Sequence, residues 1–166
     1  MRYFTIVMIL LTFSASVNGQ EAKYKALFMF KFLQNMEWPE TKVGDAYRIE
    51  VFGSRELVNE MKKVIVDRRV NGKAIEVSEY TRSELDNVNI LYIAKSKESS
   101  FYELNEQAIS KSVVVITESS GLARKGASIN FIKDNNRLKF ELNEKSFSRA
   151  HILVSSEIKT RASSVY

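Results

Sequence analysis

The segment VVVITESSGLARKGASINFIKDNNRLKFELN, residues 113–143, carries the clearest structural pattern in the chain. It begins with the apolar run Val113–Ile116, which is typical of a strand buried on both faces. A loop with two glycines follows, and then two runs, Ser128–Ile132 and Arg137–Leu142, in which apolar and polar residues alternate. The turn residues between these two runs predict a β-hairpin with one solvated face. The segment therefore predicts a central strand, a loop of small residues and a hairpin.

Strands and helices alternate along the chain before this segment. The predicted strands are Tyr47–Phe52, Ala74–Tyr80, Val88–Ala94 and Val113–Thr117, and the predicted helices between them are Arg55–Asp67, Arg82–Leu85 and Ser100–Ile109. The last two strands are nearly continuous apolar runs, which places them in the middle of a sheet. This alternation predicts an α/β fold with one domain: a mainly parallel, Rossmann-like sheet of about six strands, with an antiparallel edge hairpin and helices on both faces.

Polar residues mark where several helices are expected to begin. Ser54 directly precedes one predicted helix, and Asn143 precedes a last helical stretch, so each side chain can accept a hydrogen bond from the first turn. Thr81 and Glu84 have the spacing of a capping box for the short helix Arg82–Leu85. In the loop after the central strand, we expect the glycines to let the backbone leave the parallel sheet and re-enter it antiparallel.

Residues Glu21–Glu37 have helical periodicity and an unusually wide apolar face. Phe28 and Phe32 make that face wider than a helix needs in order to pack on one neighbouring layer. Two interpretations remain open: a core helix covered on more than one side, or a helix that packs in part on a second subunit. Trp38 precedes a proline, which disfavours the helical conformation and ends the helix. Phe28, Phe32 and Trp38 are therefore the candidate partner or homodimer surface.

Residues 1–19 have the pattern of a secretory signal peptide. Arg2 supplies the basic start, Tyr3–Phe13 the apolar stretch, and small residues up to Gly19 a cleavage site. A membrane anchor is the alternative, but a span needs about 20 apolar residues, and this run ends sooner. We expect cleavage after Gly19 and a soluble exported domain, 20–166, with no transmembrane segment.

The composition argues against most catalytic chemistries. The 166 residues include no cysteine and one histidine, His151, so the usual zinc clusters are excluded and a Ser–His–Asp triad has one candidate base. The chain also lacks the glycine-rich motifs that bind phosphates. Its 25 basic and 20 acidic residues alternate in sign along the chain, which predicts a solvated surface and no nucleic-acid partner. We expect no enzyme activity, no metal and no cofactor.

One edge of the predicted sheet collects small and hydrogen-bonding residues. Open α/β sheets bind ligands outside the carboxyl ends of their strands. Ordinary loops and a polar ligand site both fit these residues. The candidate contacts are Ser54, Ser119, Ser120, Gly121 and Lys125.

An ordered set of short segments resembles the YfiR family across the whole chain after residue 19. The segments are Phe32-Leu33 through Trp38-Pro39, Val51-Phe52-Gly53, Asn71-Gly72-Lys73-Ala74-Ile75, Ile90-Leu91-Tyr92-Ile93, Val114–Gly126 and Arg137–Asn143. The helix-ending Trp-Pro pair and the loop-to-hairpin segment are the most specific of these. The resemblance implies a periplasmic α/β domain without catalytic activity. It departs from the family in one respect, because cysteines that are common there are absent, so redox control is not carried over.

Two functions from different classes follow. The resemblance implies a non-catalytic periplasmic regulator, in some branches dimeric, that binds and modulates an inner-membrane signalling protein. That partner is a diguanylate cyclase, linking the envelope to cyclic-di-GMP, or a sensor kinase. The alternative is a periplasmic small-ligand-binding module.

Overall fold

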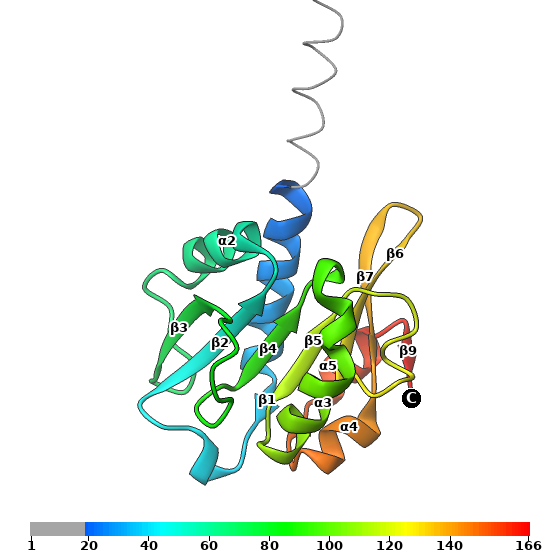
Figure 1. Cartoon of the computed structure of the whole chain (residues 1–166). Helices are drawn as coiled ribbons and strands as arrows, with labels where there is room; N and C mark the ends of the chain where they lie inside the picture. Colours follow the sequence, from blue (N-terminus) through cyan, green and yellow to red (C-terminus); the bar gives the residue numbers. More distant parts are fainter. Residues whose placement is uncertain (1–18) are drawn as a thin grey trace, which may run out of the picture.

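Seven strands form one mostly parallel sheet in the computed structural model, which describes residues 19–166 (Figure 1). Across the sheet, the order is β3-β2-β4-β5-β6-β7-β9. The strands are β2 (Ala46–Phe52), β3 (Ala74–Glu79), β4 (Ile90–Ile93), β5 (Val114–Thr117), β6 (Ile129–Asp134), β7 (Arg137–Leu142) and β9 (Ser164–Val165). All neighbours pair in parallel except β6 and β7, which form the antiparallel hairpin. A second small sheet joins β1 (Met36–Glu37) to β8 (Leu153–Val154).

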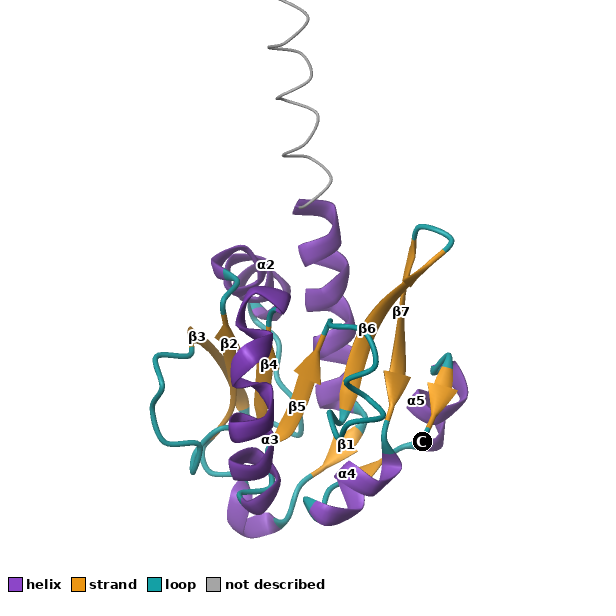
Figure 2. Ribbon diagram, turned by 45° about the vertical axis from the view of Figure 1, so that its right-hand side comes forward, coloured by secondary structure: helices purple, strands orange, loops and turns teal. Residues whose placement is uncertain are grey.

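Helices cover both faces of the large sheet (Figure 2). They are the N-terminal helix (described from residue 19 to 34), α2 (Arg55–Ile65), α3 (Phe101–Ser110), α4 (Glu144–Arg149), α5 (Ser156–Arg161) and the 3-10 helices η1 (Glu40–Lys42) and η2 (Lys95–Ser100). The N-terminal helix and α2 pack in the larger hydrophobic core, on one face, and α3 packs in a smaller core on the other. The predicted fold class is therefore confirmed.

Local sequence signals account for much of this arrangement. Every residue of β4 and β5 is buried, as their continuous apolar runs predict, and both strands lie in the middle of the sheet. The Ser54 hydroxyl accepts a hydrogen bond from the Leu57 amide at 3.2 Å, and the Asn143 side chain accepts one from the Ser146 amide at 2.9 Å. Both predicted helix caps are thus confirmed.

Three local predictions were wrong. Residues 82–85 form no helix, because Arg82 adopts a left-handed backbone with a φ of 64°. The N-terminal helix ends at residue 34, since Met36–Glu37 leaves it to pair with β8. The loop after β5 returns the chain parallel to β5, and the direction reverses one strand later, between β6 and β7. The predicted signal peptide lies outside the described residues, apart from Gly19.

Gly53 is the position where the fold most requires a glycine. It follows β2 with a φ of +89°, and an added Cβ would lie 2.6 Å from Lys97 Cγ and 3.0 Å from Ser96 Oγ. We expect Gly53→Ala to lower the free energy of unfolding by about 1–2 kcal/mol, because both the backbone and the contact become strained.

Urea denaturation of the purified protein measures this loss. Gly44→Ala is the matched control, because an added Cβ there meets nothing within 4 Å. Equal effects at the two glycines would contradict this account of Gly53.

Candidate functional site

A concave surface lies between the N-terminal helix and the β6–β7 hairpin. Figure 2 shows the hairpin projecting past the sheet beside that helix. Asn135 and Asn136 form its two-residue turn with positive φ values of 49° and 60°, which suits the twist of a tight hairpin. The hollow between the N-terminal helix and the hairpin has a volume of about 410 Å³. Its lining residues are Gln20, Glu21, Tyr24, Phe28, Lys133, Asn136, Arg137 and Leu138.

A second hollow of about 500 Å³ adjoins the first, with Glu21, Lys133 and Leu138 in the walls of both. Its remaining lining residues are Lys25, Lys95, Glu118, Ser120, Phe131 and Ile132. Glu21 and Lys133 form an ion pair at 2.5 Å, which ties the helix to the hairpin. We call the two hollows together the helix–hairpin groove.

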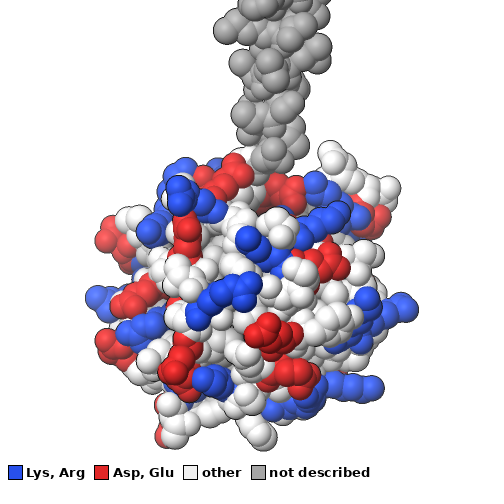
Figure 3. Space-filling view, in the orientation of Figure 1, with Lys and Arg blue, Asp and Glu red and all other residues white. Residues whose placement is uncertain are grey.

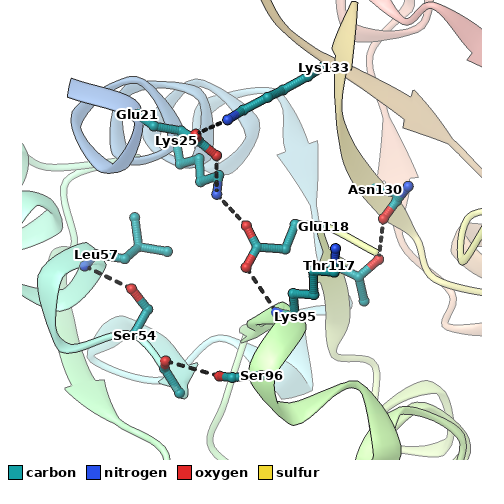
Figure 4. Close-up of polar contacts among 11 residues, drawn as sticks. Glu21, Lys25, Ser54, Leu57, Lys95, Ser96, Thr117, Glu118, Asn130 and Lys133 are labelled. Atoms are coloured by element: carbon teal, nitrogen blue, oxygen red, sulfur yellow. Dashed lines mark hydrogen bonds and ion pairs between the residues drawn. The ribbon is translucent and has the colours of Figure 1, made fainter. Parts of the chain in front are cut away.

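An unusual ion pair forms the inner wall of the groove (Figure 4). Lys25 is 8% exposed and donates to Glu118, which follows directly after β5. The same ammonium contacts Glu21 at 2.7 Å, one helical turn away. The second oxygen of Glu118 accepts a hydrogen bond from the Lys95 amide at 2.8 Å. The first described turns of the helix are thereby joined to the carboxyl ends of two central strands.

The surroundings hold both members of this pair in their charged forms. Burial alone lowers the pKa of Lys25, but the hydrogen bonds and charges of Glu118 and Glu21 outweigh it, and the net pKa is raised. Burial likewise raises the pKa of Glu118, but the Lys25 hydrogen bond and the Lys95 amide prevail and lower it. The pKa of Tyr92, buried beside Glu118, is raised by desolvation and by that charge. Neither Lys25 nor Glu118 is poised to exchange a proton near neutral pH.

The lowered pKa of Glu118 predicts an acid-sensitive contribution to stability. The contribution is fully present above the unfolded value of 4.5 and is lost as the pH falls through the lower folded value. We therefore expect Glu118→Gln to be less stable than the wild type at pH 7, and to lose less of its stability between about pH 5 and pH 3.

Urea denaturation at a series of pH values checks this expectation. Glu103→Gln, an exposed side chain on α3 with no ion pair in the described residues, is the control and should keep the wild-type slope. A Glu118→Gln slope equal to that of the wild type would contradict the account.

The structure brings together only some of the residues that the sequence singled out for a ligand. Ser120 lines the groove, and Ser54 lines a smaller hollow of about 280 Å³ on the other side of Glu118 and Lys25. Ser119 is buried, Gly121 makes a turn with a φ of +77°, and Lys125 is exposed, and none of these three lines either hollow. At the carboxyl ends of β2 and β4, where such sheets bind ligands, η2 approaches Gly53, and the hollow that Ser54 lines also includes Tyr92 of β4.

The three candidate surface residues lie in different surroundings. Phe32 has no exposed surface and Trp38 is 8% exposed, so the chain itself encloses both side chains. Phe28 is half-buried at the floor of the groove, with its ring centroid 5.7 Å from that of Phe140 and 6.1 Å from that of Phe131. The hairpin therefore covers the second side of the wide apolar helix, and Phe28 alone of the three keeps a partly accessible ring.

Sequence reasoning placed Lys95 and Glu118 at the ligand-binding edge of the sheet, but it did not connect them with Glu21, Lys25 and Lys133. Glu21 and Lys25 have the four-residue spacing of a helical ion pair, which was the one available signal. Their partners Glu118 and Lys133 are distant in the sequence, and nothing local connects them to the helix. His151, the sole histidine, is exposed just after α4 and is not among the residues that line the groove.

The described part of the chain offers little to a metal ion or a membrane span. Residues 19–166 contain no group of three or more His, Asp or Glu side chains arranged to hold a metal. In the same residues, no helix combines the length and the apolarity that crossing a bilayer requires. On the face seen in Figure 3, basic and acidic side chains are interspersed.

Comparison with solved structures identifies the fold. One match is the ABC domain in complex with L-Trp from Streptococcus pneumonia, and another is a conserved domain protein from Vibrio cholerae. Each has a TM-score of 0.52 and is matched over 76% of this chain, with identities of 11% and 9%. The chain spans just over half of those chains, 57% in each case, so the likeness concerns the fold alone. A comparison with curated proteins finds no match.

A family model matches residues 22–160, from the first turns of the N-terminal helix into α5. The match includes Lys25, Glu118 and the whole hairpin, and therefore nearly all of the groove. The family suggests a regulator of signalling proteins in the periplasm. The chain belongs to the YfiR/HmsC-like family.

Proposed function

We propose that the chain is a non-catalytic periplasmic regulator that binds an inner-membrane signalling protein, a diguanylate cyclase or a sensor kinase, and changes its output. The observation that carries the proposal is the family match over residues 22–160. The signal-peptide pattern of residues 1–19 supports export to the periplasm. The helix–hairpin groove supplies a concave surface for a partner, and its two carboxylates, Glu21 and Glu118, are held in ion pairs with lysines.

Deletion of the gene in its host tests this proposal. We expect cellular cyclic-di-GMP, or the output of a membrane sensor kinase, to change on deletion and to return when the full chain is supplied from a plasmid. The matched control is the same chain without residues 1–19, which stays in the cytoplasm and should not restore the output. Unchanged signalling after deletion, under several envelope conditions, would contradict the proposal.

A small-ligand-binding module is the second candidate, and the volume of the groove favours it. Each hollow, about 410 and 500 Å³, falls in the range of roughly 300–1,000 Å³ that is typical of ligand sites. One protein of similar fold was solved with L-Trp. A ligand present at 100 times its Kd adds about 2.7 kcal/mol to the free energy of unfolding. Thermal unfolding with L-Trp and with a set of envelope metabolites tests this candidate, and a flat response to all of them would exclude it.

A further inference from the structure

The helix–hairpin groove has an excess of positive charge. Its carboxylates, Glu21 and Glu118, are matched by Lys25 and Lys133 in the ion pairs described above. Lys95 and Arg137 also line the groove, and within residues 19–166 neither side chain makes an ion pair. Both residues are exposed. The groove therefore presents two uncompensated cations to a partner.

The first hollow, which forms the outer part of the groove, has an apolar floor. Phe28 and Leu138 are half-buried there, and Tyr24 is 47% exposed at the side. The Phe28 ring packs against Phe32, with ring centroids 5.9 Å apart, and against the hairpin aromatics behind it. A floor supported in this way keeps its shape when empty, as an anchor pocket in a protein interface does.

The hairpin also has a free strand edge beside this floor. β9 pairs with β7 only at Glu141 and Leu142, and the Ser163 amide donates to the Phe140 carbonyl at 2.8 Å. In the described chain, no strand lies on the outer side of β7 from Arg137 to Lys139. An open edge of this kind can accept an extended peptide through main-chain hydrogen bonds. A lipid or a free metabolite does not use such an edge, so it favours a polypeptide occupant.

We propose that the outer groove and the free edge of β7 bind an extended, acidic segment of a partner protein. A large apolar side chain of that segment occupies the hollow over Phe28 and Leu138. Its carboxylates pair with the side chains of Arg137 and Lys95, which form no ion pair within residues 19–166. The inference rests on the proposed function, because it names the chemistry of the segment through which the signalling partner is recognised.

Two defined peptides test the inference on the mature chain, residues 20–166. Both have ten residues, with leucine or phenylalanine alternating with a charged residue, which is glutamate in one peptide and lysine in the other. We expect the acidic peptide alone to bind, and to shift backbone amide signals of residues 24–28 and 133–138 in NMR spectra. Binding by both peptides, shifts confined to other residues, or no binding up to about 1 mM would overturn the inference. Shifts of the same amides with protein concentration, without peptide, would reveal a second copy in the groove and would also overturn it.

Matched variants separate recognition in the groove from general attraction of opposite charges. Arg137→Glu and Leu138→Ser should each weaken binding of the acidic peptide about tenfold, whereas Lys62→Glu, an exposed change on α2, should stay within about twofold. Equal weakening by Lys62→Glu and Arg137→Glu would overturn the inference, and thermal unfolding confirms that each variant is folded. If the peptide test fails but deletion of the gene still changes signalling, this inference is wrong and the proposed function stands. A deletion without effect on signalling removes the proposed function.

Discussion

Phe32→Ala is expected to lower the free energy of unfolding by about 3–5 kcal/mol, which is a large part of the stability of a domain this size. The Phe32 side chain has no exposed surface. Its ring centroid lies 4.9 Å from that of Phe140 and 6.0 Å from that of Phe131, so it joins the N-terminal helix to both strands of the hairpin. Truncation removes these contacts and leaves a cavity that a closed aromatic cluster cannot fill.

Urea denaturation followed by circular dichroism measures this loss. Leu27→Ala is the control on the same helix, because Leu27 is 36% exposed and should cost less than about 1 kcal/mol. If the variant remained as stable as the wild type and changed only the oligomeric state, Phe32 would belong to a subunit interface. That result would contradict the packing described above.

Lys25→Met is expected to lower the free energy of unfolding by about 2–3 kcal/mol at pH 7, because it leaves the half-buried Glu118 carboxylate without its cation. Without the Lys25 ammonium, burial of Glu118 should raise its pKa above the usual 4.5. A raised carboxyl pKa destabilises the folded state above that pKa, and the penalty disappears as the pH falls and the group is protonated. The deficit relative to the wild type should therefore be smaller at pH 4 than at pH 7.

Two variants make this measurement specific. Lys23→Met makes the same chemical change on the same helix at an exposed position, and should cost less than about 0.5 kcal/mol. The double variant Lys25→Met/Glu118→Gln removes the unpaired charge and should recover a substantial part of the loss. Equal small losses for Lys25→Met and Lys23→Met would show that the buried pair contributes nothing to stability.

The parts of the fold that follow from short-range patterns could be predicted from the sequence. The apolar run before Thr117 fixes a central strand, and alternation with a tight turn fixes the hairpin over 129–142. Ser54 and Asn143 cap helices because a side-chain oxygen reaches an amide three residues on, which is a local event.

The errors came from tertiary pairing and backbone conformation. Met36–Glu37 continues a helical pattern, but its strand partner Leu153–Val154 lies more than 100 residues away. Strands of two residues, such as β8 and β9, are too short to show any period. Arg82 occupies the left-handed region, which composition does not predict for an arginine, and this conformation removes the short helix expected there.

The candidate site was predicted least well, because its charges meet only in three dimensions. Glu118 and Lys25 are separated by 93 positions, and the candidate ligand contacts chosen from the sequence included the neighbouring Ser119 and Ser120 but not Glu118. The wide apolar face of the N-terminal helix was noticed, but whether a subunit or the chain itself covered it was left open. The hairpin covers the part around Phe32, Phe28 stays half-buried beside it, and Leu27 is 36% exposed.

Co-isolation from solubilised envelopes tests the central claim most directly, namely that the chain acts by binding a membrane signalling protein through the helix–hairpin groove. The chain is exported with a C-terminal tag in wild-type form and as Arg137→Glu and Lys62→Glu, and the recovered proteins are quantified by mass spectrometry. The account predicts that one membrane cyclase or kinase is recovered with the wild type and with Lys62→Glu, and is depleted about tenfold with Arg137→Glu. Recovery of no membrane signalling protein with the wild type, or equal recovery with all three forms, would contradict it.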